Sequence, residues 1–119
     1  MQGLLRNTAL GCEIERELDI GLTQLRAGNA LIDIVDVNSN LGRQRGPGPA
    51  ADGSAANLDH FCLRIEPFDA VALARHLQRH DVEATQVTTV YGAEGFGPSI
   101  YVTDPERNVV ELKGPAQSP

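Results

Sequence analysis

The sequence has no tryptophan, one methionine and two cysteines, and aromatic residues make up 4% of its 119 positions. Cys12 and Cys62 are too few and too far apart for a disulfide framework, and a small thiol in a strand is commonly a packing residue. No apolar run approaches the roughly 20 residues of a membrane-spanning helix. No signal-peptide pattern is present at the N-terminus. We therefore expect a cytoplasmic protein that does not span a membrane.

Basic residues are also in deficit. Lysine and arginine together number 10 against 16 acidic residues, which gives a formal net charge of -6. A negative protein has no electrostatic support for binding nucleic acid or an anionic membrane non-specifically. The hydrophobic content of 41% and the mixed charge are those of a folded globular protein, and the length fits one domain.

The second half of the chain has the pattern of one strand, one helix and three further strands. Asp69 is a plausible N-cap of the helix, and Leu73 and Leu77 follow at helical spacing. A glycine-rich hairpin region spans residues 92–98, and a turn at 104–108 precedes the last strand. The predicted elements are the strand 58–65, the helix 69–81 and the strands 84–91, 99–103 and 109–113.

One face of the predicted sheet carries polar groups suited to chemistry. Side chains alternate between the two faces of a strand, because the repeat is two residues. This alternation places His60 and Glu111 on one face, together with Ser99 and Tyr101. The opposite face is apolar and carries Phe61, Leu63, Ile65, Ile100, Val102, Val110 and Leu112.

The first half of the chain repeats this order incompletely. Three short strands are predicted at 13–18, 22–26 and 30–37, with turns at 19–21 and 28–29. Residues 1–10 suffice for two or three helical turns and leave no room for a strand before them. If the two halves are repeats, the first lacks its opening strand.

Three stretches carry a resemblance to a known family. They are Asp59-His60-Phe61, the strand Gly97-Pro98-Ser99-Ile100-Tyr101, and the ending with Asp104, Pro105, Asn108, Val110, Glu111 and Leu112, which is the most specific. At these residues the chain resembles the vicinal oxygen chelate superfamily, which includes the glyoxalases and the bleomycin-resistance and fosfomycin-resistance proteins.

The resemblance implies an α+β fold of paired βαβββ modules whose sheets curl around a cup. Residues 1–37 would form a first module that lacks its opening strand, 38–57 a Gly/Pro/Ala-rich linker, and 58–115 a complete second module, together one domain. A lost strand leaves an unpaired sheet edge, and dimerisation is common in the superfamily. We therefore expect a homodimer.

In metal-dependent members of the superfamily, the ligands come from the first and last strands of each module. Carried over by position, the resemblance implies that His60, Glu111 and Asp33 bind a metal, while the fourth ligand would lie on the missing strand. Asp33 stands between aliphatic residues, where a carboxylate is costly to bury unless it is paired or metal-bound. The alternative is that Asp33 faces solvent at a sheet edge or pairs with an arginine.

Two carboxylates and one imidazole suit a divalent ion such as Zn, Ni, Mn, Co or Mg. Such an ion would hold neighbouring oxygens of a small-molecule substrate and stabilise the oxyanion or enediolate of a lyase, isomerase or transferase reaction. In relatives a ligand carboxylate can act as the base, which implies a catalytic role for Glu111.

Further polar groups on the same face are candidates for substrate binding. Ser99 and Tyr101 can donate hydrogen bonds to a bound oxyanion, and Arg64 can pair with a carboxylate or phosphate. A structural role for each of the three is the alternative.

Two other classes of function remain open. A metal-free protein that sequesters a small molecule is favoured by the missing fourth ligand, although the scarcity of aromatic side chains disfavours a large aromatic drug. A degenerate copy that keeps the fold and has lost activity is the third possibility.

Overall fold

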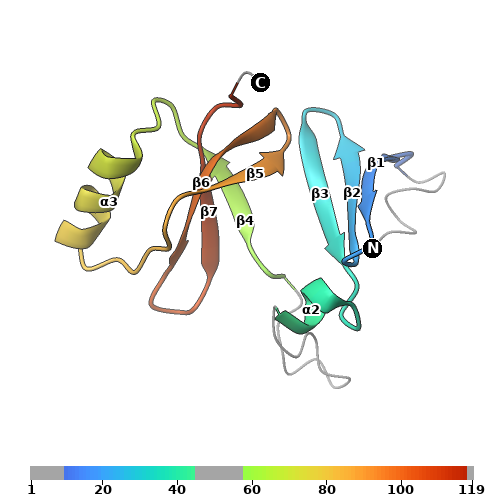
Figure 1. The fold of residues 1–119 in the computed structure, drawn as a ribbon, viewed down its shortest axis with the longest axis horizontal. Coiled ribbons are helices and arrows are strands. Elements are labelled where there is room, and N and C mark those ends of the chain that lie inside the picture. The colour runs from blue at the N-terminus through green and yellow to red at the C-terminus, as the bar shows by residue number, and fades with distance from the viewer. Residues whose placement is uncertain (1–9, 45–57, 118–119) are drawn as a thin grey trace. The chain divides into compact units, whose positions relative to one another are not determined.

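The computed structural model describes residues 10–44 and 58–117. The chain divides into two compact units, Met1–Asn57 and Leu58–Pro119, called the first and the second unit below. Figure 1 colours the elements of the first unit blue to green and those of the second unit green to red. The helical turns predicted over residues 1–10 lie outside the described residues, except for the last position. No helix in the described ranges is long and apolar enough to cross a membrane.

The first unit is an antiparallel meander followed by a short helix. Its strands are β1 (Glu13–Leu18), β2 (Leu22–Ala27) and β3 (Ala30–Val35), and they lie in the order β1-β2-β3. Glycines make the turns between them, since Gly21 and Gly28 have φ angles of 100° and 62°, which glycine adopts without strain. The prediction of three strands is confirmed, although β3 is two residues shorter than expected.

The helix α2 (Asn40–Gln44) was not predicted, because composition assigned its residues to the linker. It begins at a local cap. The Ser39 hydroxyl accepts a hydrogen bond from the Gly42 N–H at 3.1 Å, which satisfies one donor of the first helical turn. The Ser39 N–H donates to the Asp36 carbonyl at 3.0 Å, and this hydrogen bond closes the turn that follows β3.

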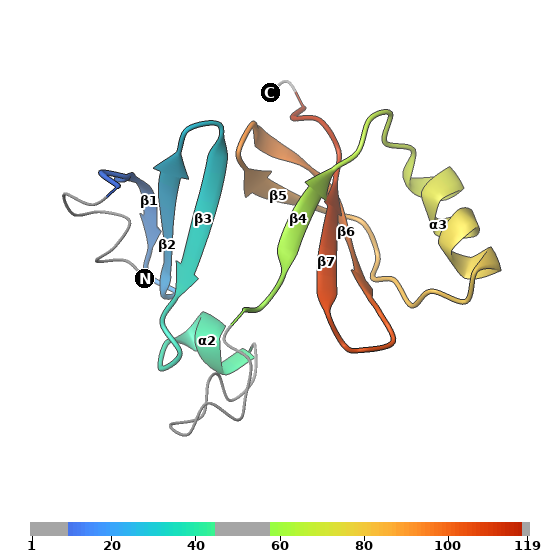
Figure 2. The same ribbon diagram turned by 180° about the vertical axis from the view of Figure 1, so that it is seen from behind.

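The second unit is a complete βαβββ module. It contains β4 (Phe61–Arg64), α3 (Ala70–Arg79), β5 (Thr88–Gly92), β6 (Gly95–Thr103) and β7 (Val109–Lys113). Their order in the sheet is β4-β7-β6-β5, with β4 parallel to β7 and the other pairs antiparallel. Figure 2 shows β4 beside β7. The predicted α+β fold, with a complete second module and a shorter first one, is confirmed.

Two predicted strands of the second unit are shorter in the structure. The parallel ladder starts at Phe61–Val110, so His60 and the two residues before it precede β4 instead of lying within it. The strand expected at 84–91 begins only at Thr88. Ala84 forms an isolated bridge to Val102, and that bridge is one residue out of register with the β5–β6 ladder. The predicted strand is therefore broken between Ala84 and Thr88.

Helix α3 begins where the sequence predicts. The Asp69 carboxylate accepts a hydrogen bond from the Ala72 N–H at 3.1 Å, which is an N-cap contact. At the end of the helix, the Leu77 carbonyl accepts hydrogen bonds from the backbone N–H groups of His80 and Val82 at 3.1 and 3.0 Å. Leu77 is among the half-buried residues of the helix, and no residue of α3 is fully buried.

The turn between β6 and β7 sets the register of the last strand. The Asp104 carboxylate accepts hydrogen bonds from the backbone N–H groups of Glu106 and Asn108 at 2.8 and 2.7 Å, and from the Asn108 side-chain amide at 2.9 Å. Arg107 takes a φ of 70°, the left-handed region that costs a residue with a Cβ. This turn places Glu111 directly opposite Tyr101.

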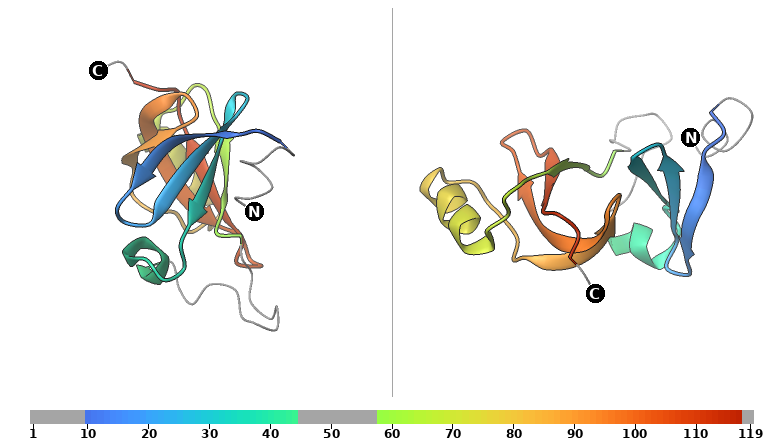
Figure 3. Two further views of the ribbon diagram at one scale, coloured as in Figure 1. Left: turned by 90° about the vertical axis from the view of Figure 1, so that its right-hand side faces the viewer. Right: turned by 90° about the horizontal axis from the view of Figure 1, so that it is seen from above.

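The strand register gives the two faces that alternation predicts, but their burial is unequal. Ile100 is 2% exposed, whereas Phe61 and Leu63 on the same face are about half exposed at 48% and 50%. On the polar face, Glu111 and Lys113 are each only 7% exposed. Figure 3 shows the curl of this sheet. The second unit thus buries polar residues on one face of its sheet as well as Ile100 on the other.

Candidate functional site

His60 and Glu111 meet on the polar face of the second unit. His60 stands just before β4, and Glu111 lies in the middle of β7, the neighbouring strand. The His60 Nε2 atom lies 3.2 Å from Glu111 Oε1. Two residues that are 51 positions apart in the sequence therefore share a hydrogen bond, which is an ion pair when the imidazole is protonated.

Each of these two side chains has a second hydrogen-bond partner. The Nδ1 atom of His60 lies 2.6 Å from Asp59 Oδ2, so the imidazole ring is held between two carboxylates. The hydroxyl of Ser99, which is 0% exposed, donates to the other Glu111 oxygen, Oε2, at 2.6 Å. The result is a continuous chain of hydrogen bonds from Asp59 through His60 and Glu111 to Ser99.

Tyr101 borders the same cluster from β6. Its ring meets the His60 ring edge-on, with centroids 5.2 Å apart and an interplanar angle of 80°. Edge-to-face packing of this kind restricts the orientation of both rings. Tyr101 thus joins His60 and Glu111, as the alternation of β6 predicts.

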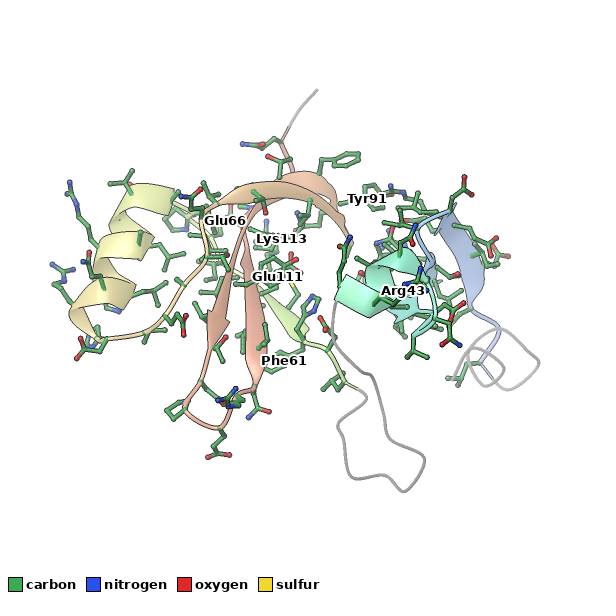
Figure 4. The ribbon with its side chains drawn as sticks, turned by 60° about the horizontal axis from the view of Figure 1, so that its bottom comes forward. Arg43, Phe61, Glu66, Tyr91, Glu111 and Lys113 are labelled. Atoms are coloured by element: carbon green, nitrogen blue, oxygen red, sulfur yellow. The ribbon has the colours of Figure 1, made fainter. Side chains whose placement is uncertain are left out.

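Lys113 is a buried cation on the same strand face as Glu111, and it is not among the site residues that the sequence predicts. Its Nζ donates hydrogen bonds to the carbonyls of Val90 and Gly97 at 2.8 and 3.2 Å. A Cβ at Gly92 would come within 2.5 Å of the lysine side chain, so that glycine leaves the room the side chain needs. Figure 4 shows Glu111 and Lys113 on the inner side of the curved sheet.

The charges of the cluster shift its protonation. The hydrogen bond to Glu111, helped by Asp59, raises the pKa of His60 in spite of partial burial. Burial works to raise the pKa of Glu111, but hydrogen bonds from His60 and Ser99 outweigh it and hold that pKa below its ordinary value. Burial also lowers the pKa of Lys113, against the attraction of Glu111. Both shifts favour the state in which an imidazolium faces an ionised glutamate.

Arg64, the predicted binder of a substrate anion, lies at the exposed end of β4. Its guanidinium pairs with Glu66 at 2.7 Å and with Glu94, which is in the turn between β5 and β6. These hydrogen bonds raise the pKa of Arg64 further. An incoming anion would therefore compete with two carboxylates that Arg64 already contacts.

Asp33, the third predicted metal ligand, belongs to the first unit. It lies on β3, an edge strand of its sheet, and is exposed. Its Oδ1 accepts a hydrogen bond from Gln24 Nε2 on β2 at 3.0 Å. The structure thus brings His60 and Glu111 together within one unit, and the participation of Asp33 stays a prediction.

The geometry of the His60–Glu111 pair fits two ligands of one metal ion. Two atoms bound at about 2.0 to 2.1 Å to a tetrahedral ion lie roughly 3.3 Å apart, and Nε2 and Oε1 are separated by 3.2 Å. The contacts from Asp59 and Ser99 are those that orient metal-bound imidazoles and carboxylates in proteins. In the ranges that the structure describes, no group of three or more His, Cys, Asp or Glu side chains gathers around a metal position.

Two residues of the site, Asp59 and Lys113, are not among the predicted site residues, although the sequence holds a sign of each. Asp59 directly precedes His60, so its contact with the ring is local. Lys113 follows Glu111 by two positions and therefore shares its face.

Cys62 was expected to be a packing residue, but it is exposed on the edge strand β4.

No family model matches the sequence, and no curated protein matches it. Similar solved structures include a virulence protein from Salmonella typhimurium, with 15% identity over 96% of this chain and 84% of that chain, at a TM-score of 0.44. They also include the fosfomycin resistance protein FosX from Listeria monocytogenes, with 17% identity over 94% and 78% of the two chains (TM-score 0.38). A third is a glyoxalase/bleomycin resistance protein/dioxygenase from Alicyclobacillus acidocaldarius, with 13% identity over 97% and 81% (TM-score 0.38).

The last two structures carry names of the superfamily that the sequence motifs resemble. With TM-scores under 0.5 and identities under 25%, this likeness carries no argument about this chain. The functional argument therefore rests on the residues of the site.

Proposed function

We propose that this protein binds a divalent metal ion through His60 and Glu111, and that the ion holds neighbouring oxygens of a small-molecule substrate. The observation that carries the proposal is the 3.2 Å approach of His60 Nε2 to Glu111 Oε1. Both atoms belong to residue types that bind Zn, Ni, Mn, Co or Mg. Each side chain also has an orienting partner on its other polar atom.

The residues of the site divide the chemical work between them. When bound, the ion supplies Lewis-acid stabilisation of developing negative charge. Glu111 is the proposed base that removes a proton from a substrate in a lyase, isomerase or transferase reaction. Its lowered pKa favours the ionised form that can accept a proton, although it also makes the carboxylate a weaker base. Ser99 holds the second carboxylate oxygen of Glu111, Oε2, by a hydrogen bond, and Asp59 orients the ring of His60 through Nδ1. Tyr101, Arg64 and Ser99 are the proposed contacts to the substrate, and Ser99 would have to give up its hydrogen bond to Glu111 to donate to a bound oxyanion.

A homodimer is part of the proposal. In the described part of the chain, β4 pairs only with β7, which leaves its other edge open to a second copy. Phe61 and Leu63 on that strand are about half exposed, at 48% and 50%, and would lose that exposure in a dimer. The cytoplasmic location stays a prediction from the sequence.

A second candidate function is favoured by Lys113. A lysine cation beside Glu111 already supplies part of the positive charge that a metal would bring. The site could then bind a small polar molecule without a metal, and His60 and Glu111 would act as a proton-exchanging pair. The metal titration distinguishes the two candidates.

The test is a titration of the purified, chelator-treated protein with Zn, Mn, Ni and Co by calorimetry, supported by elemental analysis. We expect one ion per chain, and a loss of affinity of at least 100-fold in His60→Ala and in Glu111→Gln. The matched control is His76→Ala, which changes an exposed histidine on α3 of the same unit. Wild-type protein that takes up none of the four ions, or binding that survives both site variants, would refute the metal proposal and leave the metal-free candidate.

A further inference from the structure

Two cations stand side by side at one end of the polar face of the second unit. Arg64 on β4 pairs directly with Lys113 on β7, so the two side chains project from the same face of the sheet. Like charges at facing positions of neighbouring strands repel each other. The arrangement therefore favours an anion close to both cations.

In the structure, Glu94 supplies that anion. Its Oε1 accepts a hydrogen bond from Arg64 Nε. Burial lowers the pKa of Lys113, against the attraction of Glu111, Cys62 and Glu94. Glu94 lies in the turn between β5 and β6, whereas β4 is at the opposite edge of the sheet from β5. The carboxylate meets Arg64 because the sheet curls, as Figure 3 shows.

Lys113 is fixed at this end of the face and keeps one donor in reserve. The residue is 7% exposed, and its Nζ donates to the carbonyls of Val90 and Gly97 at 2.8 and 3.2 Å. An ammonium group has three N–H donors. Among the described residues, these two carbonyls are the hydrogen-bond partners of Nζ, so one N–H remains for an anion.

The contact between Arg64 and Glu94 is suited to exchange. Their side chains are 45% and 49% exposed, and ion pairs in contact with water contribute little because solvent screens them. A carboxylate or phosphate group from solution offers the guanidinium the same negative charge and the same kind of acceptor oxygen. Such a group could take the place of Glu94 without breaking a buried contact.

We propose that Arg64 and Lys113 form an anion subsite, which the Glu94 carboxylate occupies in the structure, and that a carboxylate or phosphate group of the substrate replaces Glu94 there. Glu111 precedes Lys113 by two positions on the same face, so the subsite adjoins the proposed base. Its link to catalysis rests on the proposed function, for which it names acidic small molecules as the substrate class. The subsite itself needs no metal ion.

The experiment titrates the chelator-treated full chain with inorganic phosphate and, separately, with acetate at constant ionic strength. Two-dimensional NMR follows the Nε–Hε signal of Arg64 and the backbone amide of Lys113, and each titration gives a dissociation constant. Glu94→Gln removes the competing charge, and Arg64→Gln removes the guanidinium. The matched control is Glu106→Gln, because it removes one negative charge from an exposed turn residue of the same unit.

We expect both signals to shift and saturate in the wild type. Glu94→Gln should lower the dissociation constant about 2- to 5-fold relative to Glu106→Gln, which corresponds to the release of an exposed ion pair. Arg64→Gln should raise it at least about 10-fold, because a hydrogen bond to a charged group is lost. The anion that binds more tightly identifies the acid group that the subsite prefers.

Equal tightening in Glu94→Gln and Glu106→Gln would overturn the exchange with Glu94 and leave a general effect of net charge. Shifts that do not saturate, or binding that is unchanged in Arg64→Gln, would overturn the subsite.

Failure of the proposed function gives a different result. A chain that binds phosphate in this way but takes up no Zn, Mn, Ni or Co keeps the subsite and refutes the metal site. A chain that binds a metal ion through His60 and Glu111 but shows no saturable phosphate or acetate response at Arg64 keeps the metal site and overturns the subsite.

Discussion

Replacing His60 with alanine should destabilise the second unit by an amount that depends on pH. The substitution removes the imidazolium that faces Glu111, which is 7% exposed and ionised. A hydrogen bond to a charged group contributes about 1.5 to 3 kcal/mol. Ser99 and Lys113 remain to stabilise the glutamate, so we expect a loss of about 2 kcal/mol in the free energy of unfolding near pH 6.

The direction of the pH dependence follows from the two shifts. The pKa of His60 is raised above its ordinary value of 6.5, so its contribution is complete below that pH and is lost as the pH rises through the folded-state pKa. The pKa of Glu111 is lowered below 4.5, so its contribution is present above that pH and is lost as the pH falls through the folded-state pKa. The pair therefore stabilises most between about pH 5 and 6.5.

Tyrosine fluorescence during urea unfolding is a suitable assay. The chain has no tryptophan, and its two tyrosines, Tyr91 and Tyr101, both lie in the second unit. The signal thus reports that unit alone. We expect the cost of His60→Ala to fall from about 2 kcal/mol at pH 6 to about 1 kcal/mol at pH 9, where a neutral imidazole leaves only a weaker hydrogen bond.

The exposed His76 supplies the control, since His76→Ala changes a histidine of the same unit outside the cluster. An equal cost of His60→Ala at pH 6 and pH 9 would refute the reasoning. So would a pH dependence in His76→Ala as large as that in His60→Ala.

Two smaller predictions test the support of the site. Ser99→Ala removes the hydroxyl that donates to Glu111 at 2.6 Å, and should cost about 1 to 3 kcal/mol and raise the pKa of Glu111. Urea unfolding and a carboxyl NMR titration measure both effects, and an unmoved pKa would contradict the role of the hydroxyl. Arg107→Gly relieves a φ of 70° and should stabilise the unit by about 0.5 to 1 kcal/mol. A lower Tm for that variant would show that the arginine side chain contributes more than its backbone strain costs.

The features that the sequence predicted well are those set by local chemistry. Asp69 caps α3 because a carboxylate before a helical segment can reach the backbone N–H of the first turn. Asp104 and Asn108 close the turn that starts β7, and β7 has the predicted bounds. The two-residue alternation then placed Glu111 and Tyr101 on one face without knowledge of any distant contact.

The features that the sequence missed depend on partners far along the chain. β4 extends only as far as its ladder with β7, and β5 is shortened by a one-residue change of register against β6. Neither limit is visible in the strand's own residues. The helix α2 is different, because its Ser39 cap is local and was passed over in favour of composition.

The electrostatics of the cluster determine how a metal ion would enter it. Lys113 and Ser99 stabilise the ionised form of Glu111 whether or not a metal is bound. Glu111 could therefore bind a metal ion without first losing a proton. His60 is in the opposite state, because two neighbouring carboxylates favour its protonated ring. Metal uptake must therefore displace the proton of His60, and affinity should rise with pH until that proton is lost. Lys113 opposes the same ion by charge repulsion. In the proposed metal site, His60 and Glu111 would therefore bind the ion only as His60 loses its proton.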